Sequence, residues 1–428
     1  MKLDDSQALL KRCRKQNERL QKALEINHLI AGELELGPLL RQIMEITQSI
    51  MDAEGCSLFL IDKQTGDLVF HNTTASHEAQ MKELCRLSMG CGIAGWCAEH
   101  SSTVRLNDVY SDSRFADEFD KLTGFKTRNM ICVPMIARGQ LIGVSQVINH
   151  HHGDFSLSEE ELMESLVPME AIAIDNARTH QRLLDKQMLK HDLELAKSIQ
   201  QSYLPSSMPD VAGYAASTYI HPAFEVGGDF FDAVTLPDRR IAYLLGDISG
   251  KGVSAAMVMS GVLQALRSEL NHGGSAGEIL SRYNQSLCQT ASNGMFASIA
   301  LMILDPETGI VESANAGHPP PIHLSKQRIW QADEASGPPG GIISNVHYDC
   351  ETAVMEAGEM ILFYSDGLTD ARNEQQQMIG MNRILAWMQD APANAPACID
   401  YLTKRINSFV GDAPQTDDIT LMALIRSD

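Results

Sequence analysis

Residues 241–252 read IAYLLGDISGKG, a short apolar run that ends at an acidic residue among three glycines. An apolar run of this length, bounded by turn residues, is typical of a buried β-strand. Glycine beside the acidic residue allows close approach of the backbone and unusual dihedral angles. The stretch therefore predicts a core strand that carries the side chain of Asp247 to the edge of a sheet.

Three further stretches repeat this pattern in the C-terminal half. They are residues 226–232 (VGGDFFD), 365–370 (SDGLTD) and 416–420 (TDDIT). Apolar runs expected to be strands precede the second, from Met360 to Tyr364, and follow the third, from Ile419 to Ile425. Strands bring distant residues to one edge of a sheet, so we expect the four motifs to converge there. For any single motif the alternative is ordinary turn chemistry, because Asp and Gly are common turn residues.

Converging carboxylates predict a site for hard metal ions. Several carboxylates close together repel and cannot all stay ionised without positive charge. The motifs offer oxygen ligands without His or Cys, which favours Mg²⁺ or Mn²⁺ over zinc. Two such ions about 3.5–4 Å apart can share and deprotonate a water molecule and hold phosphoryl oxygens for in-line displacement. The pattern thus predicts hydrolysis of a phosphate ester without a covalent enzyme intermediate, with two divalent cations, Mn²⁺ or Mg²⁺, as cofactors.

The four motifs, in this order, resemble the SpoIIE/RsbU-type branch of the PPM serine/threonine phosphatases. Three more stretches carry the resemblance: residues 196–205 (AKSIQQSYLP), 315–320 (NAGHPP) and 337–340 (GPPG). The resemblance implies a fold of two packed β-sheets flanked by helices, an αββα sandwich, over residues 205–428. It also implies a phosphoserine or phosphothreonine substrate on a small regulatory protein, typically an anti-sigma-factor antagonist with a STAS fold.

The resemblance implies roles for individual residues as well. Asp247 would bridge both metal ions, with the backbone carbonyl of Ile248 beside it. Asp366 and Asp417 would hold one ion and Asp229 the other. Asp229 and Asp247 would be the catalytic residues.

Other polar residues stand beside these motifs without an expected bond to a metal. They are Asp232, Asp370, Asp418 and Lys251. The eukaryotic-type PPM enzymes hold phosphate with an arginine near the first acidic motif, and no Arg closely precedes Asp229 here. Lys251, or the backbone amides around Gly250, could take this part, because cations and exposed amides bind anions.

Residues 36–157 predict a second domain, of the α+β class. A helix is expected over Leu39 to Met51, with strands over residues 57–62, 68–70, 129–137 and 141–149. Four stretches resemble a GAF sensory domain: residues 92–97 (GIAGWC), 106–109 (LNDV), 125–135 (FKTRNMICVPM) and 141–149 (LIGVSQVIN). The resemblance implies a small-molecule sensor and leaves its ligand open.

Cyclic-nucleotide-binding GAF domains carry an Asn-Lys, Phe, Asp-Glu signature late in the domain. The matching residues here are Asn149-His150, Phe155 and Glu159-Glu160, with His in place of Lys and Glu in place of Asp. A cyclic nucleotide therefore stays one alternative for the GAF ligand. Residues 150–152, three histidines, are expected in a solvated loop, because adjacent side chains point in different directions and suit a metal poorly.

Two long helices are predicted outside these domains. Residues 6–34 show a seven-residue repeat with Asn17 at a core position, which indicates a parallel coiled coil in residues 1–35 and hence a homodimer. The alternative is an amphipathic helix folded back on its own domain. The second helix, residues 158–204, is expected to be capped at Ser158 and to contain Pro168 near its start. A continuous helix can transmit a rotation or a change of pairing from a sensor to an enzyme.

Composition narrows the class of protein. The net charge is −21, and from Pro205 onward 12 Lys and Arg face 26 Asp and Glu, a net charge of −14. A nucleic-acid partner requires a basic surface, so none is expected. No stretch approaches the ~18 apolar residues of a membrane helix, and we expect no membrane partner and a cytoplasmic location.

The nine cysteines include no Cys-x-x-Cys pair, which argues against a disulfide framework or a zinc knuckle. The series Cys85, Cys91 and Cys97 could sense redox state, although packed core thiols are the favoured interpretation.

The sequence thus predicts a multidomain α+β protein: a coiled-coil helix (1–35), a GAF α/β sensor domain (36–157), a connecting helix (158–204) and a PPM-type phosphatase domain (205–428). The predicted function is a phosphoprotein phosphatase regulated by the GAF domain and by dimeric helices. The alternative is a non-catalytic dimeric signalling scaffold with a GAF small-molecule sensor. Acidic residues at all four expected ligand positions favour the enzyme.

Overall fold

The computed structural model describes residues 35–73, 86–117, 120–121, 124–290, 294–326, 328–331 and 335–427. The coiled coil predicted for residues 6–34 lies outside the described residues. The chain divides into two compact units, Met1–Met188 and Leu189–Asp428. Within the described ranges, no helix is both long enough and apolar enough to cross a membrane.

The N-terminal unit is built on a six-stranded antiparallel sheet in the order β3-β2-β1-β6-β5-β4. Its strands are β1 (Ala53–Ile61), β2 (Leu68–Thr73), β3 (Arg86–Leu87), β4 (Val104–Leu106), β5 (Met130–Ala137) and β6 (Gln140–His150). Four of them overlap the predicted strands, and the predicted helix corresponds to α2 (Leu36–Met51). The α+β prediction for this unit is therefore confirmed.

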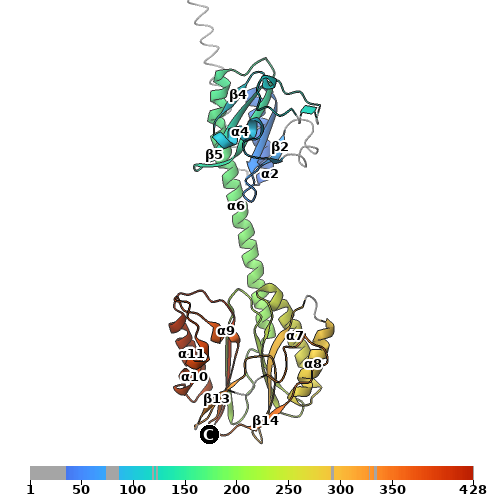
Figure 1. Cartoon of the computed structure of the whole chain (residues 1–428), viewed down its shortest axis with the longest axis vertical. Helices are drawn as coiled ribbons and strands as arrows, with labels where there is room; N and C mark the ends of the chain where they lie inside the picture. The colour runs from blue at the N-terminus through green and yellow to red at the C-terminus, as the bar shows by residue number, and fades with distance from the viewer. Residues whose placement is uncertain are drawn as a thin grey trace, which may run out of the picture. The chain divides into compact units, whose positions relative to one another are not determined.

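Both faces of this sheet are covered by helices (Figure 1). Side chains alternate along β1, so that Leu58 and Leu60 point to one face and Phe59 to the other. The first face packs against α2 and the beginning of α6 (Leu157–Tyr203), and the second against α4 (Gly92–His100). The unit therefore has two apolar layers, one on each side of the sheet.

The late GAF signature is part of the packing in this unit. His150 ends β6, and its Nε2 atom lies 3.3 Å from Glu159 Oε1 on α6. The ring of Phe155, which is buried, lies 5.2 Å from that of His150. The prediction of a solvated loop is wrong for His150, because β6 runs one residue further and α6 supplies an acidic partner. His151 and His152 are exposed, as predicted.

The cysteines that the structure describes are all free thiols. Cys91 is exposed, whereas Cys97 is buried and its Sγ donates to the carbonyl of Cys132 at 3.5 Å. Cys85 lies outside the described residues. The packed-thiol interpretation therefore suits Cys97.

Helix α6 runs for 47 residues and confirms the prediction of one long helix after the GAF domain. Its predicted cap is wrong by two residues. Ser156, which precedes the helix, donates from its backbone N–H and from its hydroxyl to Glu159 Oε2, each at 2.8 Å. The bond from the Ser156 N–H to Glu159 is one half of a capping box, in which an acidic side chain three residues on reaches back to the first turn. Pro168 lies inside the helix.

The C-terminal unit stacks two five-stranded antiparallel sheets, ordered β14-β11-β10-β9-β8 and β13-β12-β15-β16-β7. The strands are β7 (Tyr214–His221), β8 (Phe230–Thr235), β9 (Ile241–Ile248), β10 (Ala297–Leu304), β11 (Ile310–Ala316), β12 (Ile322–Leu324), β13 (Ile329–Gln331), β14 (Glu351–Val354), β15 (Met360–Tyr364) and β16 (Ile419–Arg426). The strands predicted around the acidic motifs are confirmed as β9, β15 and β16.

Helices cover the outer faces of both sheets (Figure 1). The helices α7 (Val253–Asn271) and α8 (Ala276–Thr290) pack against the first sheet. The helices α10 (Gly380–Gln389) and α11 (Ala395–Val410) pack against the second. A third apolar cluster, with Tyr243, Met302 and Phe363, fills the space between the sheets. The predicted αββα sandwich is confirmed.

Candidate active site

Strand periodicity places two acidic residues between the sheets. On β9, Tyr243 and Leu245 belong to the cluster between the sheets, and Asp247 is two residues further along the same face. On β8, Phe231 belongs to the same cluster, and Asp229 stands two residues before it. Both carboxylates therefore emerge at the end of the sandwich where the apolar filling stops.

The second sheet holds Asp229 in place. Thr420, near the start of β16, donates from its hydroxyl to Asp229 Oδ2 at 2.5 Å. The backbone N–H of Thr420 donates to Ser365 Oγ at 2.9 Å, and Ser365 Oγ donates to the carbonyl of Asp418 at 3.1 Å. Residues from three motifs that are distant in sequence therefore meet around one carboxylate.

Asp418 supports the backbone of the first motif. Its carboxylate accepts from the N–H groups of Ala223 at 2.8 Å and of Gly228 at 2.7 Å. A Cβ atom at Gly227 would lie 2.2 Å from Asp418 Oδ2, and one at Gly228 would lie 2.8 Å from the carbonyl of Ile248. The two glycines are thus required because a carboxylate and a carbonyl approach the backbone at this turn.

The acidic residues of this end influence one another's ionisation. Burial, followed by the charge of Asp247, raises the pKa of Asp229 well above its usual range. Burial, followed by the charges of Asp366 and Asp417, raises the pKa of Asp247 to about 7. The pKa of Asp366 is also raised, by burial and then by Asp417. Like charges raise carboxyl pKa values in this way when they share a site without enough positive charge.

The positively charged side chain of Lys251 lies beside this group of carboxylates. Lys251 Nζ donates to Asp417 Oδ2 at 2.9 Å and to the carbonyl of Thr416 at 2.6 Å. Its side chain is half exposed, so the pair contributes little to stability. Lys251 therefore stands at the rim of the carboxylate group, held by the last motif.

Two acidic residues from the motifs have other surroundings. Asp232 is buried against Arg267 of α7, whose Nε donates to Asp232 Oδ2 at 2.6 Å. Asp370 is exposed at the end of the short helix α9 (Asp366–Asp370) and accepts from Thr369 Oγ1 at 3.3 Å. Asp232 thus anchors a helix to the sheet, and Asp370 contributes its charge from the surface.

A cation fits this end of the sandwich by ligand type. Within the described part of the chain, no three Asp, Glu, His or Cys side chains already form a cluster that could hold a metal ion. The available donors are carboxylates and backbone carbonyls, the oxygen ligands of Mg²⁺ and Mn²⁺. The raised pKa values of Asp229, Asp247 and Asp366 reflect burial first and then the charge of neighbouring carboxylates, which a cation would relieve. Binding would require these side chains to close on the ions.

A cavity of about 540 Å³ opens beside the carboxylates and brings in residues that the sequence motifs did not identify as functional. Its lining includes Asp247, Ser298, Gly317, His318, Pro319, Pro320, Ala335 and Asp366. Ser298 lies on β10 directly opposite Asp247 in the sheet register. Strand alternation with Ala300 and Met302 could have placed it on this face, but only once its pairing with β9 was known.

The linker helix also touches this region. Gln200, in the last turn of α6, donates from Nε2 to the carbonyl of Gly227 at 2.6 Å and accepts from its N–H at 3.2 Å. Arg267, which pairs with Asp232, also donates to the carbonyl of Tyr203 at 2.8 Å. The end of α6 is therefore hydrogen-bonded to the turn that precedes Asp229.

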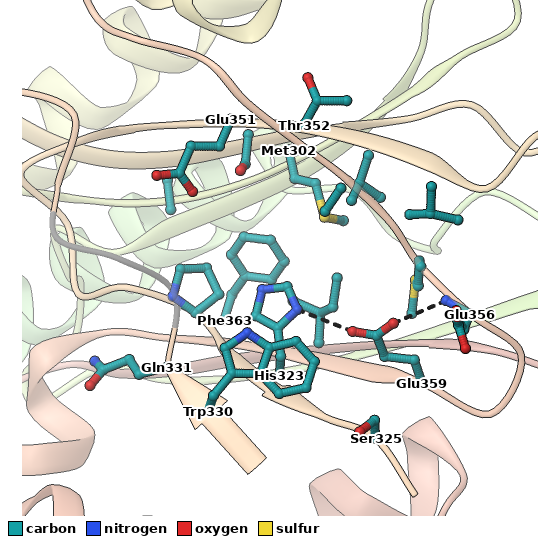
Figure 2. Close-up of a pocket in the computed structure, with 18 of the residues that line it drawn as sticks. Met302, His323, Ser325, Trp330, Gln331, Glu351, Thr352, Glu356, Glu359 and Phe363 are labelled. Carbon is teal, nitrogen blue, oxygen red and sulfur yellow. Dashed lines mark hydrogen bonds and ion pairs between the residues drawn. The ribbon is translucent and has the colours of Figure 1, made fainter. Parts of the chain in front are cut away.

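A larger cavity, of about 750 Å³, lies between the edge strands β14 and β13 (Figure 2). Among its lining residues, His323 Nδ1 lies 3.3 Å from Glu359 Oε1, and the ring of Trp330 stacks on His323 with a centroid distance of 5.0 Å. Arg328 lies over the ring of Trp330, with its Cζ atom 4.2 Å from the ring centroid. None of the four predicted ligands lines this cavity.

Comparisons with known proteins agree with this architecture. Residues 237–427 match the family "Stage II sporulation protein E (SpoIIE)", and residues 35–174 match the family "GAF domain". The SiaA-PP2C domain of Pseudomonas aeruginosa superposes with a TM-score of 0.51 at 19% identity, over 57% of this chain and 98% of that domain. The C-terminal unit therefore has the PP2C phosphatase fold.

Two curated relatives match parts of the chain. Protein IcfG of Synechocystis sp. is 27% identical over 264 residues, which are 55% of this chain and 42% of IcfG. The dual 3',5'-cyclic-AMP and -GMP phosphodiesterase 11A of Takifugu rubripes is 36% identical over 167 residues, 36% of this chain and 18% of that enzyme. The chain spans less than half of either relative. Together with the family matches, the fold identifies a GAF domain over residues 35–174 and a SpoIIE-type PP2C phosphatase domain over residues 237–427.

Proposed function

We propose that this protein is a metal-dependent serine/threonine phosphoprotein phosphatase. The observation that carries the proposal is the group of carboxylates at this end of the sandwich, where burial and then the charges of neighbouring carboxylates raise the pKa of Asp229, Asp247 and Asp366. A protein that used this end only for packing would gain stability by pairing or removing such charges. Their retention supports a site that is completed by cations.

The proposed ligands are Asp229, Asp247, Asp366, Asp417 and the backbone carbonyl of Ile248. When bound, two divalent cations, Mn²⁺ or Mg²⁺, would supply an activated water and positive charge for the phosphoryl oxygens. The role of the protein would be to hold the carboxylates in position for the ions. The hydrogen bond from Thr420 to Asp229 supports this role.

Lys251 is our candidate for holding the substrate phosphate. It stands half exposed at the rim and is already directed toward the acidic group by Asp417. A lysine binds phosphate as a compact charge, without the two-pronged geometry of arginine. Its ammonium group would exchange part of its contact with Asp417 for contact with the phosphate.

The proposed substrate is a phosphoserine or phosphothreonine on a regulatory protein, an anti-sigma-factor antagonist of the STAS fold. As predicted from the sequence, the protein would meet this substrate in the cytoplasm.

We further propose that the GAF domain regulates the phosphatase through α6. Residues 181–192 of this helix are exposed on all sides, and they include Leu183, Leu184 and Met188. A helix without packing partners is marginal in water, which supports a second copy as the partner in a homodimer. The bonds between Gln200 and Gly227 offer a direct connection from the helix to the turn before Asp229. The GAF ligand would be a small molecule, and a cyclic nucleotide stays one alternative.

The test is metal-dependent release of phosphate by the full chain, with p-nitrophenyl phosphate and a phosphoserine peptide as substrates. We expect activity with Mn²⁺, its loss with a chelator, and a fall of several orders of magnitude in Asp247→Ala with the thermal unfolding profile retained. Glu164→Ala, an exposed residue of α6 in the N-terminal unit, serves as the control. Activity of Asp247→Ala near that of the wild type would defeat the site assignment. Absence of activity in the wild type would favour the non-catalytic scaffold.

A further inference from the structure

Ser298 and His318 form a hydrogen-bonded pair beside the carboxylates, on the wall of the 540 Å³ cavity. Ser298 Oγ and His318 Nδ1 lie 2.8 Å apart. The serine is half-buried, and the histidine is only 3% exposed. Because Ser298 stands opposite Asp247 in antiparallel strands, the two side chains project from the same face of the sheet.

The turn that carries His318 is fixed by its own hydrogen bonds. Asn315 Nδ2 donates to the carbonyl of His318 at 2.9 Å, and the N–H of His318 donates to Asn315 Oδ1 at 2.8 Å. Gly317 has φ of +70°, and a Cβ atom there would lie 2.5 Å from Pro339 Cδ. His318 is therefore held in one position, which makes it a reliable partner for the Ser298 hydroxyl.

The state of the imidazole determines which way the Ser298 hydroxyl points. Burial lowers the pKa of His318 to about 3, opposed by the backbone carbonyl of Tyr364. A neutral imidazole has one N–H donor and one acceptor nitrogen. Nδ1 faces the Ser298 hydroxyl, and the backbone carbonyl of Tyr364 is the other acceptor near the ring, although Nε2 forms no hydrogen bond. We assign Nδ1 as the acceptor, so the Ser298 hydroxyl donates to it.

When the Ser298 hydroxyl donates to His318, the lone pairs of its oxygen can still accept a hydrogen bond from a group in the cavity. A hydroxyl has one donor and two acceptor sites. The group that needs such an acceptor next to Asp247 is the attacking water, which must hold its lone pair toward phosphorus while its hydrogens point elsewhere.

We propose that Ser298 accepts a hydrogen bond from the attacking water and orients it, and that His318 is the positioning residue that fixes the Ser298 hydroxyl. This inference rests on the proposed phosphatase function. In the hydrolysis the water oxygen bonds to phosphorus while the phosphorus–oxygen ester bond breaks. The leaving oxygen takes up a proton released by the water, and Ser298 keeps its own proton throughout. A neutral His318 is not expected to serve as the general acid.

The test compares Ser298→Ala, Ser298→Thr and His318→Asn in the full chain. Ser298→Ala is expected to lower kcat by roughly 100-fold, the low end of the range for one oriented hydrogen bond to a reacting group. KM and the Mn²⁺ affinity, measured by calorimetry, should stay within about twofold because no ligand is removed. Ser298→Thr should restore most of the activity, since it keeps the hydroxyl. Ser313→Ala, a half-buried serine on the neighbouring β11, is the matched control.

His318→Asn keeps an acceptor near the position of Nδ1 and should lose less activity than His318→Leu. The double variant Ser298→Ala/His318→Leu should be no slower than Ser298→Ala alone, because both changes remove the same interaction. Unchanged kcat in Ser298→Ala, or a loss of kcat explained wholly by weaker Mn²⁺ binding or unfolding, would overturn the inference and leave the phosphatase standing. An inactive wild-type protein would overturn both.

Discussion

The two cavities of the C-terminal unit differ in how their acidic side chains are compensated. In the larger cavity, burial tends to raise the pKa of Glu359, yet His323 and the N–H of Glu356 outweigh it, and the pKa is lowered. In the smaller one, burial and then the charges of Asp366 and Asp417 raise the pKa of Asp247. Beside this cavity, burial and then the charge of Asp247 raise the pKa of Asp229. The candidate active site is therefore identified by acidic side chains whose charge is not offset by basic or donor groups, and not by the volume of the cavity.

The largest expected contrast is in activity. Asp229→Asn keeps the shape of a buried side chain but removes its charge, and kcat/KM should fall roughly 10³-fold, about 4 kcal/mol of transition-state stabilisation. Glu359→Gln, in the larger cavity, should leave kcat/KM within about threefold. Both are measured as Mn²⁺-dependent phosphate release. Equal losses in the two variants would remove the distinction between the cavities.

Glu170 tests whether a buried carboxylate without a basic partner also has a raised pKa when it lies far from the smaller cavity. It is buried on α6 in the N-terminal unit, accepts from Thr47 Oγ1 at 2.5 Å, and burial raises its pKa to about 7. Because the folded-state pKa lies above the unfolded value, this group lowers stability as pH rises from about 4.5 through 7. The loss should approach the order of 3 kcal/mol above pH 8.

Glu170→Gln should abolish most of that pH dependence and leave the N-terminal unit more stable at pH 8 than the wild type. Urea denaturation at pH 5 and pH 8 measures it, with exposed Glu164→Gln on the same helix as the control. A wild-type unit that is as stable at pH 8 as at pH 5 would contradict this assignment.

Gln200 tests whether α6 influences the candidate active site, since its side chain connects α6 to the turn before Asp229. Gln200→Ala should reduce kcat/KM by about tenfold, because a small displacement of a catalytic group is costly to rate. Gln181→Ala, on an exposed part of the same helix, is the control. A tenfold loss in both variants would point to the helix as a whole, rather than to the Gly227 contact.

The smallest effect is expected for a lining residue of the larger cavity. Arg328→Ala removes the cation over Trp330 and should lower the free energy of unfolding by about 0.5–1 kcal/mol. Phosphatase activity should not change. Loss of activity in Arg328→Ala would link this cavity to the reaction.

Local patterns predicted most of the framework. The apolar runs before Asp247 and Asp366 and after Asp418 became β9, β15 and β16, because they are too short for a buried helix and are bounded by turn residues. The cap of α6 was missed by two residues, since two serines precede acidic residues there and only the helix geometry selects Ser156.

The sequence by itself determined the strands beside the acidic motifs, four strands of the N-terminal unit, the long helix and the set of acidic motifs, all of which depend on residues close together along the chain. The tertiary structure alone decided their use: Asp418 supports the turn at Gly228, Asp232 pairs with Arg267, and Ser298 faces Asp247. These pairings join residues 35 to 190 positions apart. No local pattern encodes them, because register and sheet packing are set by the whole core at once.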